Sequence, residues 1–477
     1  MRPARACEEL LVSLGFRWII GSVSTLAVLS ISATASAVSD EPPHRSVHEA
    51  HEAARLGAAS QYARIAPAER EAAATTDPAA TAAPDAPRGS VPRSINPEPC
   101  EVVYGYLPYW VSRQGIRWDH LSHVGMFSLG VRSDGRLTNS VGWPWTDTIA
   151  EAQSHGVRVE IVITQFNPTT IREVLDNPTA RDRLLGEIAW AVFVAGVDGV
   201  NIDFEGSVSN GWPTLMPAFL SDLRARVRTL SPDATVSIAT PPYNWGHWNF
   251  RDIAASVDLV FIMGYAFSGS FSSQTGPTAP LGGSGISLTG ALDAQYAQAI
   301  AEFPERIVLG VPYYGERWNT SSPLPRAPVQ SYVGSITYAA SQALAEPGWN
   351  WDAPSSTPWH LAAISGGYRQ SWADDAPSTR LKLDLARSRG IAGVGIWALN
   401  YDAGRSEMWE MLAQFNAEGC PEPCPADLTG DGVIDADDFF LFLQLFADGD
   451  LQADINGDGV IDADDFFEYL SLFAAGC

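Results

Sequence analysis

Three polar side chains alternate along a segment that otherwise has the composition of an apolar β-strand. Within Val197–Glu205, the residues Asn201, Asp203 and Glu205 carry an amide and two carboxyl groups. Side chains on a strand point alternately to opposite faces, so these three share one face and the apolar residues share the other. Burying them costs free energy unless they bond one another or serve a function. The pattern therefore indicates either an internal polar network or paired carboxyl groups for acid–base chemistry.

The segments around this strand predict an α/β fold, a (β/α)₈ TIM barrel. Short apolar runs alternate with amphipathic, helix-like stretches between Cys100 and Cys420, which implies a parallel sheet. Eight such runs fit the barrel, and active sites in that fold lie at the carboxyl ends of the strands. The runs are VVYGYLPYW, HVGMFSLGV, VRVEIVITQF, GVNIDFE, TVSIATP, LVFIMGYAF, IVLGVPYYG and GVGIWAL.

Composition limits the classes of function. The 477 residues are too many for one ordinary domain unless that domain is a large barrel, and 46% of them are hydrophobic, which permits a substantial core. The net charge of −25 argues against a nucleic-acid partner, because phosphate binding needs a basic face. After Cys420 the chain carries 14 of its 55 Asp and Glu residues and no Lys or Arg. This concentration indicates either a solvated acidic tail or ligands for cations.

Two twelve-residue repeats in the acidic tail predict a small all-α module that binds two Ca²⁺ ions. Oxygen ligands stand at positions 1, 3, 5, 9 and 12, a carbonyl serves at position 7, and glycine stands at position 6, as in EF-hand loops. Each repeat runs into an apolar stretch suited to a short helix. The expected ligands are Asp427, Thr429, Asp431, Val433, Asp435 and Asp438 in the first repeat, and Asp454, Asn456, Asp458, Val460, Asp462 and Asp465 in the second.

The N-terminal region predicts export. Basic residues, an apolar run over Trp18–Ile31 and the sequence Ala35-Ser36-Ala37 indicate a signal peptide over residues 1–37. An uncleaved anchor is the alternative, although the run is shorter than the ~20 residues of a membrane span. Residues 38–99 are rich in Ala, Pro and Thr and predict a disordered linker. We therefore expect a secreted or cell-surface-associated protein, with no membrane contact after cleavage of the signal.

Four cysteines remain after the signal peptide, and an even number in an exported chain suggests disulfides. Four cysteines allow three pairings. Because Cys100 and Cys420 bracket the predicted barrel and Cys424 and Cys477 bracket the acidic tail, we expect the pairs Cys100–Cys420 and Cys424–Cys477. The same positions give the expected domain boundaries, a barrel over 100–420 and a calcium module over 424–477.

The segment Asp198–Glu205 resembles the D-G-x-[D/N]-x-D-x-E signature of glycoside hydrolase family 18, the chitinase family. Other strands resemble the family in the expected order over about Glu101 to Ala417. The matching segments are Tyr104-Gly105-Tyr106 in the first strand, Met263-Gly264-Tyr265 in the sixth, Leu309–Gly315 in the seventh and Gly393–Trp397 in the eighth.

The resemblance implies a glycosidase that cleaves β-1,4-linked N-acetylglucosamine glycans, such as chitin, chitooligosaccharides or peptidoglycan. It also implies a substrate-assisted, retaining mechanism, in which no carboxylate acts as the nucleophile. Glu205 would protonate the leaving oxygen and later activate water. The 2-acetamido oxygen would attack the anomeric carbon to give an oxazolinium ion, which Asp203 would orient and stabilise. Tyr265 would bond the acetamido group, and no cofactor is expected in the barrel.

The same resemblance suggests which residues bind the sugar. Trp397 would form an apolar floor under the sugar in the −1 subsite, although a tryptophan there could also be plain core. Tyr106 and Asn201 belong to the matching strands, and Trp110 and Trp245 lie near predicted strand ends or loops. Further aromatic residues in similar places could extend the site, namely Tyr109, Trp143, Trp145, Trp248 and Trp318.

Two positions depart from the family pattern. Asn201 stands where many members have Asp, and Ala266 stands where active members usually carry Asp. The loss at Ala266 favours an alternative, a catalytically silent chitinase-like carbohydrate-binding protein. The intact pair Asp203 and Glu205 favours an enzyme. A third hypothesis is a structural surface protein whose tail performs the main task.

Aspartate at position 12 and one helix after each loop make the acidic tail resemble dockerin modules. These modules bind cohesin domains and attach enzymes to scaffolds or cell surfaces. The expected partners are therefore an N-acetylglucosamine-containing polysaccharide and a cohesin-like scaffold or surface protein. The usual cohesin-contacting residues are not recognisable in these repeats.

Overall fold

The computed structural model describes His48 and residues 101–206, 212–244, 248–283, 285–344, 348–419, 425–429 and 434–475. The chain divides into Met1–Glu41 and Pro42–Cys477, and every described residue belongs to the second unit. The predicted signal peptide, nearly all of the predicted linker and the four cysteines of the expected disulfides lie outside the described residues. No helix in the described part is both long and apolar enough to span a membrane.

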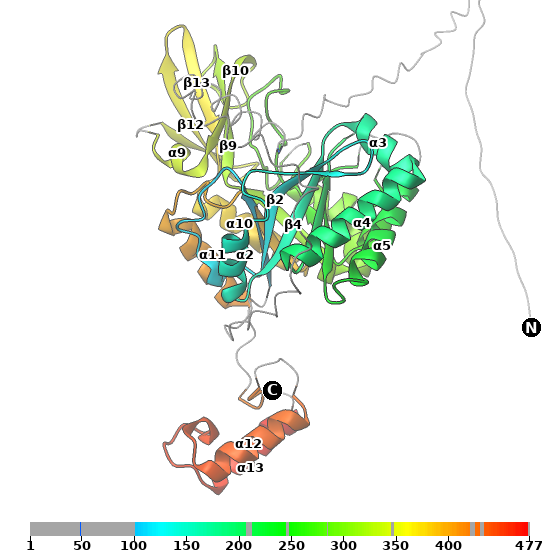
Figure 1. Ribbon diagram of the computed structural model, residues 1–477. Helices are drawn as coiled ribbons and strands as arrows, with labels where there is room; N and C mark the ends of the chain where they lie inside the picture. The colour runs from blue at the N-terminus through cyan, green and yellow to red at the C-terminus, as the bar shows by residue number, and fades with distance from the viewer. Residues whose placement is uncertain are drawn as a thin grey trace, which may run out of the picture. The chain divides into compact units, whose positions relative to one another are not determined.

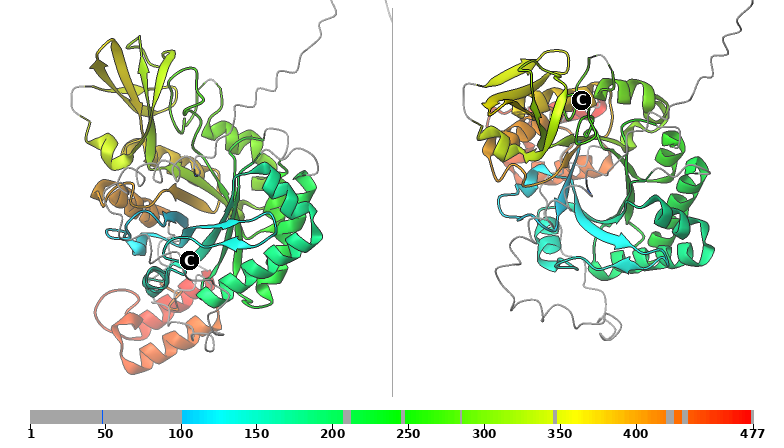
Figure 2. Two further views of the ribbon diagram at one scale, coloured as in Figure 1. Left: turned by 45° about the horizontal axis from the view of Figure 1, so that its top comes forward. Right: turned by 90° about the horizontal axis from the view of Figure 1, so that it is seen from above.

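Eight parallel strands close into a barrel, which confirms the predicted fold class (Figures 1 and 2). The strands are β1 (Val102–Pro108), β2 (His123–Val131), β4 (Arg158–Gln165), β5 (Gly199–Phe204), β6 (Thr235–Thr240), β7 (Leu259–Ile262), β8 (Ile307–Pro312) and β14 (Gly393–Trp397). The first strand pairs with both β2 and β14, so the ring has no open edge. A short strand, β3 (Leu137–Thr138), forms an antiparallel pair with β2 outside the ring.

Helices follow the strands and cover the barrel. They are α2 (Thr146–Ser154), α3 (Pro168–Asp176), α4 (Pro178–Ala195), α5 (Trp212–Arg228), α6 (Phe250–Ser256), α7 (Leu288–Gly290), α8 (Ala297–Glu302), α10 (Ala376–Ser388) and α11 (Ser406–Gly419), with short turns η3 (Trp118–His120), η4 (Ala291–Gln295) and η5 (Pro304–Arg306). Local sequence explains their ends. Asn177 accepts the first free N–H groups of α4, Pro178 takes its first position, and Gly196 ends it in the left-handed conformation.

A second sheet was not predicted. It is antiparallel, in the order β10-β9-β13-β12-β11, and it stands between β8 and α10, on the carboxyl-end side of the barrel (Figure 1). Its elements are β9 (Tyr314–Thr320), β10 (Val329–Thr337), α9 (Tyr338–Gln342), β11 (Trp349–Asp352), β12 (Thr357–Ile364) and β13 (Gly367–Trp372). Trp318, Trp359 and Trp372 form its core. The suggestion that Trp318 extends the sugar site is therefore wrong, because this side chain is fully buried there.

The second sheet also contacts the loop after β7. The indole nitrogen of Trp318 donates to the carbonyl of Gly269 at 3.1 Å. The hydroxyl of Thr275 donates to the side-chain oxygen of Gln370 at 2.6 Å. Since this loop contains Tyr265, the second sheet supports one wall of the barrel mouth.

Two glycines make room for an aromatic ring inside the barrel. A Cβ atom on Gly395 of β14 would lie 2.1 Å from the ring of Phe261, and one on Gly310 of β8 would lie 2.3 Å from the same ring. Real atoms do not approach so closely. These glycines, which belong to the matching motifs, thus let the Phe261 ring fill the space between three strands.

The C-terminal module has the predicted all-α architecture. Its elements are α12 (Ala436–Asp448), η6 (Leu451–Ala453) and α13 (Ala463–Ala475). Phe442 and Tyr469 stack at 3.9 Å with their ring planes 2° apart, and each belongs to one of the two helices. Ala426 and Ala453 complete the buried core. The two apolar stretches therefore pack on one another, as their sequences suggested.

Candidate active site

The strand β5 aims its polar residues into the barrel, as the alternation predicted. Asn201 and Asp203 are fully buried, and Glu205, directly after the strand, keeps 16% of its side chain exposed. The backbone N–H of Glu205 donates to the carbonyl of Gln165 at 3.1 Å, which holds this residue beside the end of β4. One carboxyl group is thus sealed from water and the other reaches the mouth.

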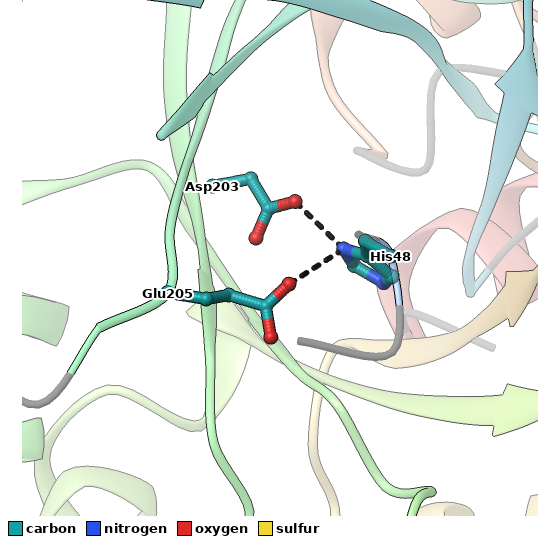
Figure 3. Close-up of side chains that lie close together, drawn as sticks. All are labelled: His48, Asp203 and Glu205. Atoms are coloured by element: carbon teal, nitrogen blue, oxygen red, sulfur yellow. Dashed lines mark hydrogen bonds and ion pairs between the residues drawn. The ribbon is translucent and has the colours of Figure 1, made fainter. Parts of the chain in front are cut away.

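The carboxyl groups of Asp203 and Glu205 converge on one point (Figure 3). That point is occupied by the imidazole of His48, whose Nδ1 lies 2.6 Å from Oδ2 of Asp203 and 3.1 Å from Oε1 of Glu205. The second oxygen of Asp203, Oδ1, has no hydrogen-bond partner among the described residues. Both carboxyl groups can therefore act on a single group placed between them.

Aromatic residues enclose this point. Trp397, at the end of β14, lies against the His48 ring with centroids 3.8 Å apart. The hydroxyl of Tyr265, after β7, lies 3.0 Å from Nε2 of His48. Tyr106 donates its hydroxyl hydrogen to Oδ1 of Asn201 at 2.9 Å. The structure thus brings together all of the expected catalytic residues and three of the five expected sugar-binding residues.

The two remaining sugar-binding candidates differ in position. Trp110 follows β1 and is half-buried. Its ring packs against that of Phe127 in a T-shaped arrangement, with the ring centroids 5.7 Å apart. The ring centroid of Phe127 lies 4.9 Å from that of Trp397. Phe127 therefore separates Trp110 from the point where the two carboxyl groups converge. Trp245 lies outside the described residues.

A buried glutamate beneath the site was not predicted. Glu160 of β4 is fully buried and accepts hydrogen bonds from the hydroxyls of Tyr104 at 2.9 Å and Thr235 at 2.6 Å, and from Ser237. Ser237 also accepts from the amide of Asn201 at 2.7 Å, which links Glu160 to β5. Burial raises the pKa of Glu160 to about 7, although these hydroxyls oppose the change. Its signal in the sequence was a charged residue within the apolar run VRVEIVITQF.

The environment also changes the acidity of Asp203. Burial raises the pKa of this carboxyl, the nearby His48 lowers it, and the Glu205 carboxyl raises it, with a net value of about 6. A carboxyl group with this pKa can hold or release a proton near neutral pH. Asp203 is therefore suited to proton exchange with a bound molecule.

Ala266 adopts an unusual backbone conformation beside the site. Its φ of 60° is in the left-handed region, where residues other than Gly, Asn and Asp are disfavoured. It follows Tyr265 directly and is only partly buried. The backbone at this position therefore suits the Asp of the family pattern better than the Ala found here.

A polar cavity of about 600 Å³ lies at the carboxyl ends of β2 and β4. Its walls include Tyr109, Ser128, Thr164, Gln165 and Asn167. Thr164 pairs with Asp203 across β4 and β5, so the cavity lies next to β5. Hydroxyl and amide groups of this kind suit the hydroxyls of a sugar chain.

The second predicted calcium loop is described in full, and its donors fit Ca²⁺. Carboxyl and amide oxygens from Asp454, Asn456, Asp458 and Asp465 accept the loop's own backbone N–H groups, which fixes the turn. Gly459, at position 6, has a φ of 83°. An all-oxygen donor set is what Ca²⁺ prefers. In the first loop, Asp431 and Val433 lie outside the described residues, whereas Asp427, Thr429, Asp435 and Asp438 lie within them.

Comparisons with known proteins identify the family of the chain. Residues 102–402 match the model of the glycosyl hydrolases family 18, so the chain belongs to this family of glycosidases. It is 26% identical over 319 residues to a putative sporulation-specific glycosylase, YdhD, of Bacillus subtilis, covering 63% of this chain and 68% of that protein.

Solved structures share the fold. The group IV chitinase of Ostrinia furnacalis in complex with allosamidin has a TM-score of 0.60 and 17% identity, and covers 67% of this chain and 100% of its own. A chitinase-like agglutinin of Robinia pseudoacacia has a TM-score of 0.59 and 19% identity, and covers 65% of this chain and 98% of its own. The fold thus occurs both in proteins named as chitinases and in one named as an agglutinin.

Proposed function

We propose that this protein is a secreted glycoside hydrolase that cleaves β-1,4-linked N-acetylglucosamine glycans by substrate-assisted, retaining catalysis. The observation that carries the proposal is the convergence of Asp203 and Glu205 on one point that is floored by Trp397 and bordered by Tyr265. A sugar bound at that point would present its anomeric carbon and its acetamido group to both carboxyl groups.

The environments of the two carboxyl groups suit different tasks. Glu205, partly exposed at the mouth, would transfer its proton to the leaving oxygen while the acetamido oxygen bonds to the anomeric carbon. Asp203 is buried, and one of its oxygens has no hydrogen-bond partner among the described residues, so it would accept the acetamido N–H and balance the charge of the oxazolinium ion. Water would then add to the anomeric carbon and return a proton to Glu205. The hydroxyl of Tyr265 would bond the acetamido oxygen.

The polar cavity next to the site supports a polymeric substrate. Its volume of about 600 Å³ would hold further sugar units beside the catalytic point. We infer that the substrate is chitin, a chitooligosaccharide or the glycan strand of peptidoglycan. Side-by-side assays of these substrates, with chitosan as a poorly acetylated comparison, would identify the class, because the mechanism requires the acetamido group.

Kinetics of two variants test the mechanism. Glu205→Gln keeps the size of the side chain but removes the transferable proton, so we expect kcat to fall by at least about 100-fold. Glu410→Gln, an exposed substitution with the same charge change, should leave kcat unaltered. Nuclear magnetic resonance of the first product should show retained β-configuration. Inverted product, or equal rates for Glu205→Gln and the wild type, would contradict the proposal.

A silent carbohydrate-binding protein is the second candidate function. The absence of the usual Asp at position 266 favours it, and the family fold is shared by the Robinia agglutinin. This candidate predicts binding of N-acetylglucosamine oligomers without turnover in the wild type and in every variant. Detectable hydrolysis that Glu205→Gln abolishes would exclude it.

We also propose that the C-terminal module binds two Ca²⁺ ions and attaches the enzyme to a protein partner, such as a cohesin-like scaffold or cell-surface protein. Phe440 and Phe467 stand at equivalent positions of the two repeats and are 64% and 66% exposed. Contiguous exposed apolar patches mark interaction sites, and we propose that these two phenylalanines belong to such a surface. Ca²⁺-dependent binding to a cohesin domain would support this role if the double variant Phe440→Ser and Phe467→Ser abolishes it.

A further inference from the structure

His48 is the unexpected member of the active site. It precedes the barrel's first strand and is 155 residues from Asp203 in sequence, yet its side chain is fully buried between the catalytic groups (Figure 3). The surrounding rings are Trp397, Tyr265, Tyr106 and Phe127. The chain thus places one of its own side chains where the substrate is proposed to react.

Both nitrogens of the ring have suitable partners. Nδ1 lies within hydrogen-bond distance of Asp203 and Glu205, both of which accept when ionised, so Nδ1 carries the hydrogen. Nε2 faces the hydroxyl of Tyr265 at 3.0 Å, which can donate to it or accept from it. The ring plane lies 29° from that of Trp397, a stacked arrangement. Both nitrogens of the imidazole thus have polar partners, and one face of the ring is covered by Trp397.

Electrostatics favours the charged form of the ring. Burial lowers the pKa of His48, but the carboxyl groups of Asp203 and Glu205 raise it more, to about 10. The other titratable groups facing the ring from the packed elements are the hydroxyls of Tyr106 and Tyr265, and burial keeps both of these neutral. At neutral pH the active site therefore holds an imidazolium ion.

We propose that His48 is a built-in inhibitor that mimics the cationic intermediate of the reaction, so that the full-length protein is latent until this residue is displaced. The inference rests on the proposed function. An imidazolium and an oxazolinium are both flat, five-membered, positively charged rings that carry an N–H. In each case Asp203 accepts that N–H, Tyr265 faces the opposite edge and Trp397 covers one face. Molecules that resemble high-energy intermediates bind more tightly than substrates.

The covalent link to the barrel strengthens this competition. A group joined covalently to its site competes with free ligands at an effective concentration that is set by the connecting chain. The substrate must displace His48 before it can bind. The apparent affinity for substrate is therefore the intrinsic affinity multiplied by the fraction of molecules whose site is free. Proteolytic cleavage between His48 and the barrel would remove the tether, and activation would then be irreversible.

Displacement by sugar tests the proposal with full-length protein. Calorimetric titration with tri-N-acetylchitotriose should give an affinity at least about tenfold higher for His48→Ala than for the wild type. His51→Ala, a matched change three positions away, should behave as the wild type. Cleavage at a protease site inserted between residues 66 and 99 should bring wild type and His48→Ala to the same affinity. Equal affinities of the uncut proteins, including no binding by either, would overturn the proposal.

Two further readouts separate this inference from the proposed hydrolysis. Histidine side-chain NMR should show that His48 remains protonated well above pH 6.5, and ordinary titration near that value would overturn its docking. Tighter sugar binding by His48→Ala without turnover would support the inference and contradict the hydrolase. His48, Asp203 and Glu205 also form a cluster whose donor atoms lie within 4.8 Å of one another. Inhibition that requires added Zn²⁺ would overturn the hydrogen-bonded arrangement in favour of a metal-bound one.

Discussion

The buried carboxyl group of Glu160 should make stability depend on pH. Its pKa is about 7 in the folded chain against 4.5 ordinarily, so folding favours the protonated form. The stability that it contributes is fully present below pH 4.5 and is lost as pH rises through about 7. This shift corresponds to about 3 kcal/mol.

Glu160→Gln should therefore flatten this dependence. The amide cannot ionise, and the hydroxyls of Tyr104, Thr235 and Ser237 can rotate to accept from it. Between about pH 5 and pH 8 we expect the free energy of unfolding to fall by about 3 kcal/mol less than in the wild type, as measured with urea. Glu410→Gln should retain the wild-type slope. A Glu160→Gln curve parallel to the wild type would show that this carboxyl does not titrate in the range.

Ala266 offers a second test at the residue scale. Ala266→Asp would supply the carboxyl group of the family pattern and a residue that tolerates a φ of 60°. We expect kcat/KM to rise several-fold and the free energy of unfolding to rise by about 1 kcal/mol. The measurement is best made in the His48→Ala background, where the site is free. Ala266→Asn separates the two effects, since it should reproduce the gain in stability without the gain in rate.

At the scale of elements, the interior glycines should tolerate no side chain. Gly395→Ala would force a methyl group against the Phe261 ring in the tight space between β14 and β7, at a cost of about 1–3 kcal/mol. Gly186→Ala provides the matched control, because it lies within α4 with its nearest neighbour 3.6 Å from the new Cβ. We expect this control to be as stable as the wild type or up to about 1 kcal/mol more stable. Thermal unfolding of both variants would give the comparison.

The barrel strands could be predicted because parallel strands buried on both faces are almost continuously apolar, as in His123–Val131. The second sheet could not, because β10 and β11 each bury only one residue fully and interrupt the strand–helix alternation. Asp203 and Glu205 were found because they break an apolar strand, and Glu160 carried the same signal. His48 carried none, since its role depends on a long-range contact that no local pattern encodes.

For the molecule as a whole, we expect two independent unfolding transitions. The C-terminal helices have a small core around Phe442 and Tyr469, so binding of Ca²⁺ should supply much of the module's stability. Calorimetry with EDTA should abolish the transition of the module and leave that of the barrel in place. The double variant Asp427→Ala and Asp454→Ala should reproduce the effect without chelator. A thermogram unaffected by EDTA would contradict the calcium assignment.

The closure of the barrel also has a consequence for biosynthesis. Val102 of β1 pairs with Gly393 of β14, so the barrel can close only after its last strand has been synthesised. A chain emerging from the ribosome exposes Asp203 and Glu205 long before Trp397 is made. Such distant pairing slows folding. The site around Asp203 and Glu205 therefore cannot be assembled during synthesis until nearly all of residues 102–397 have emerged.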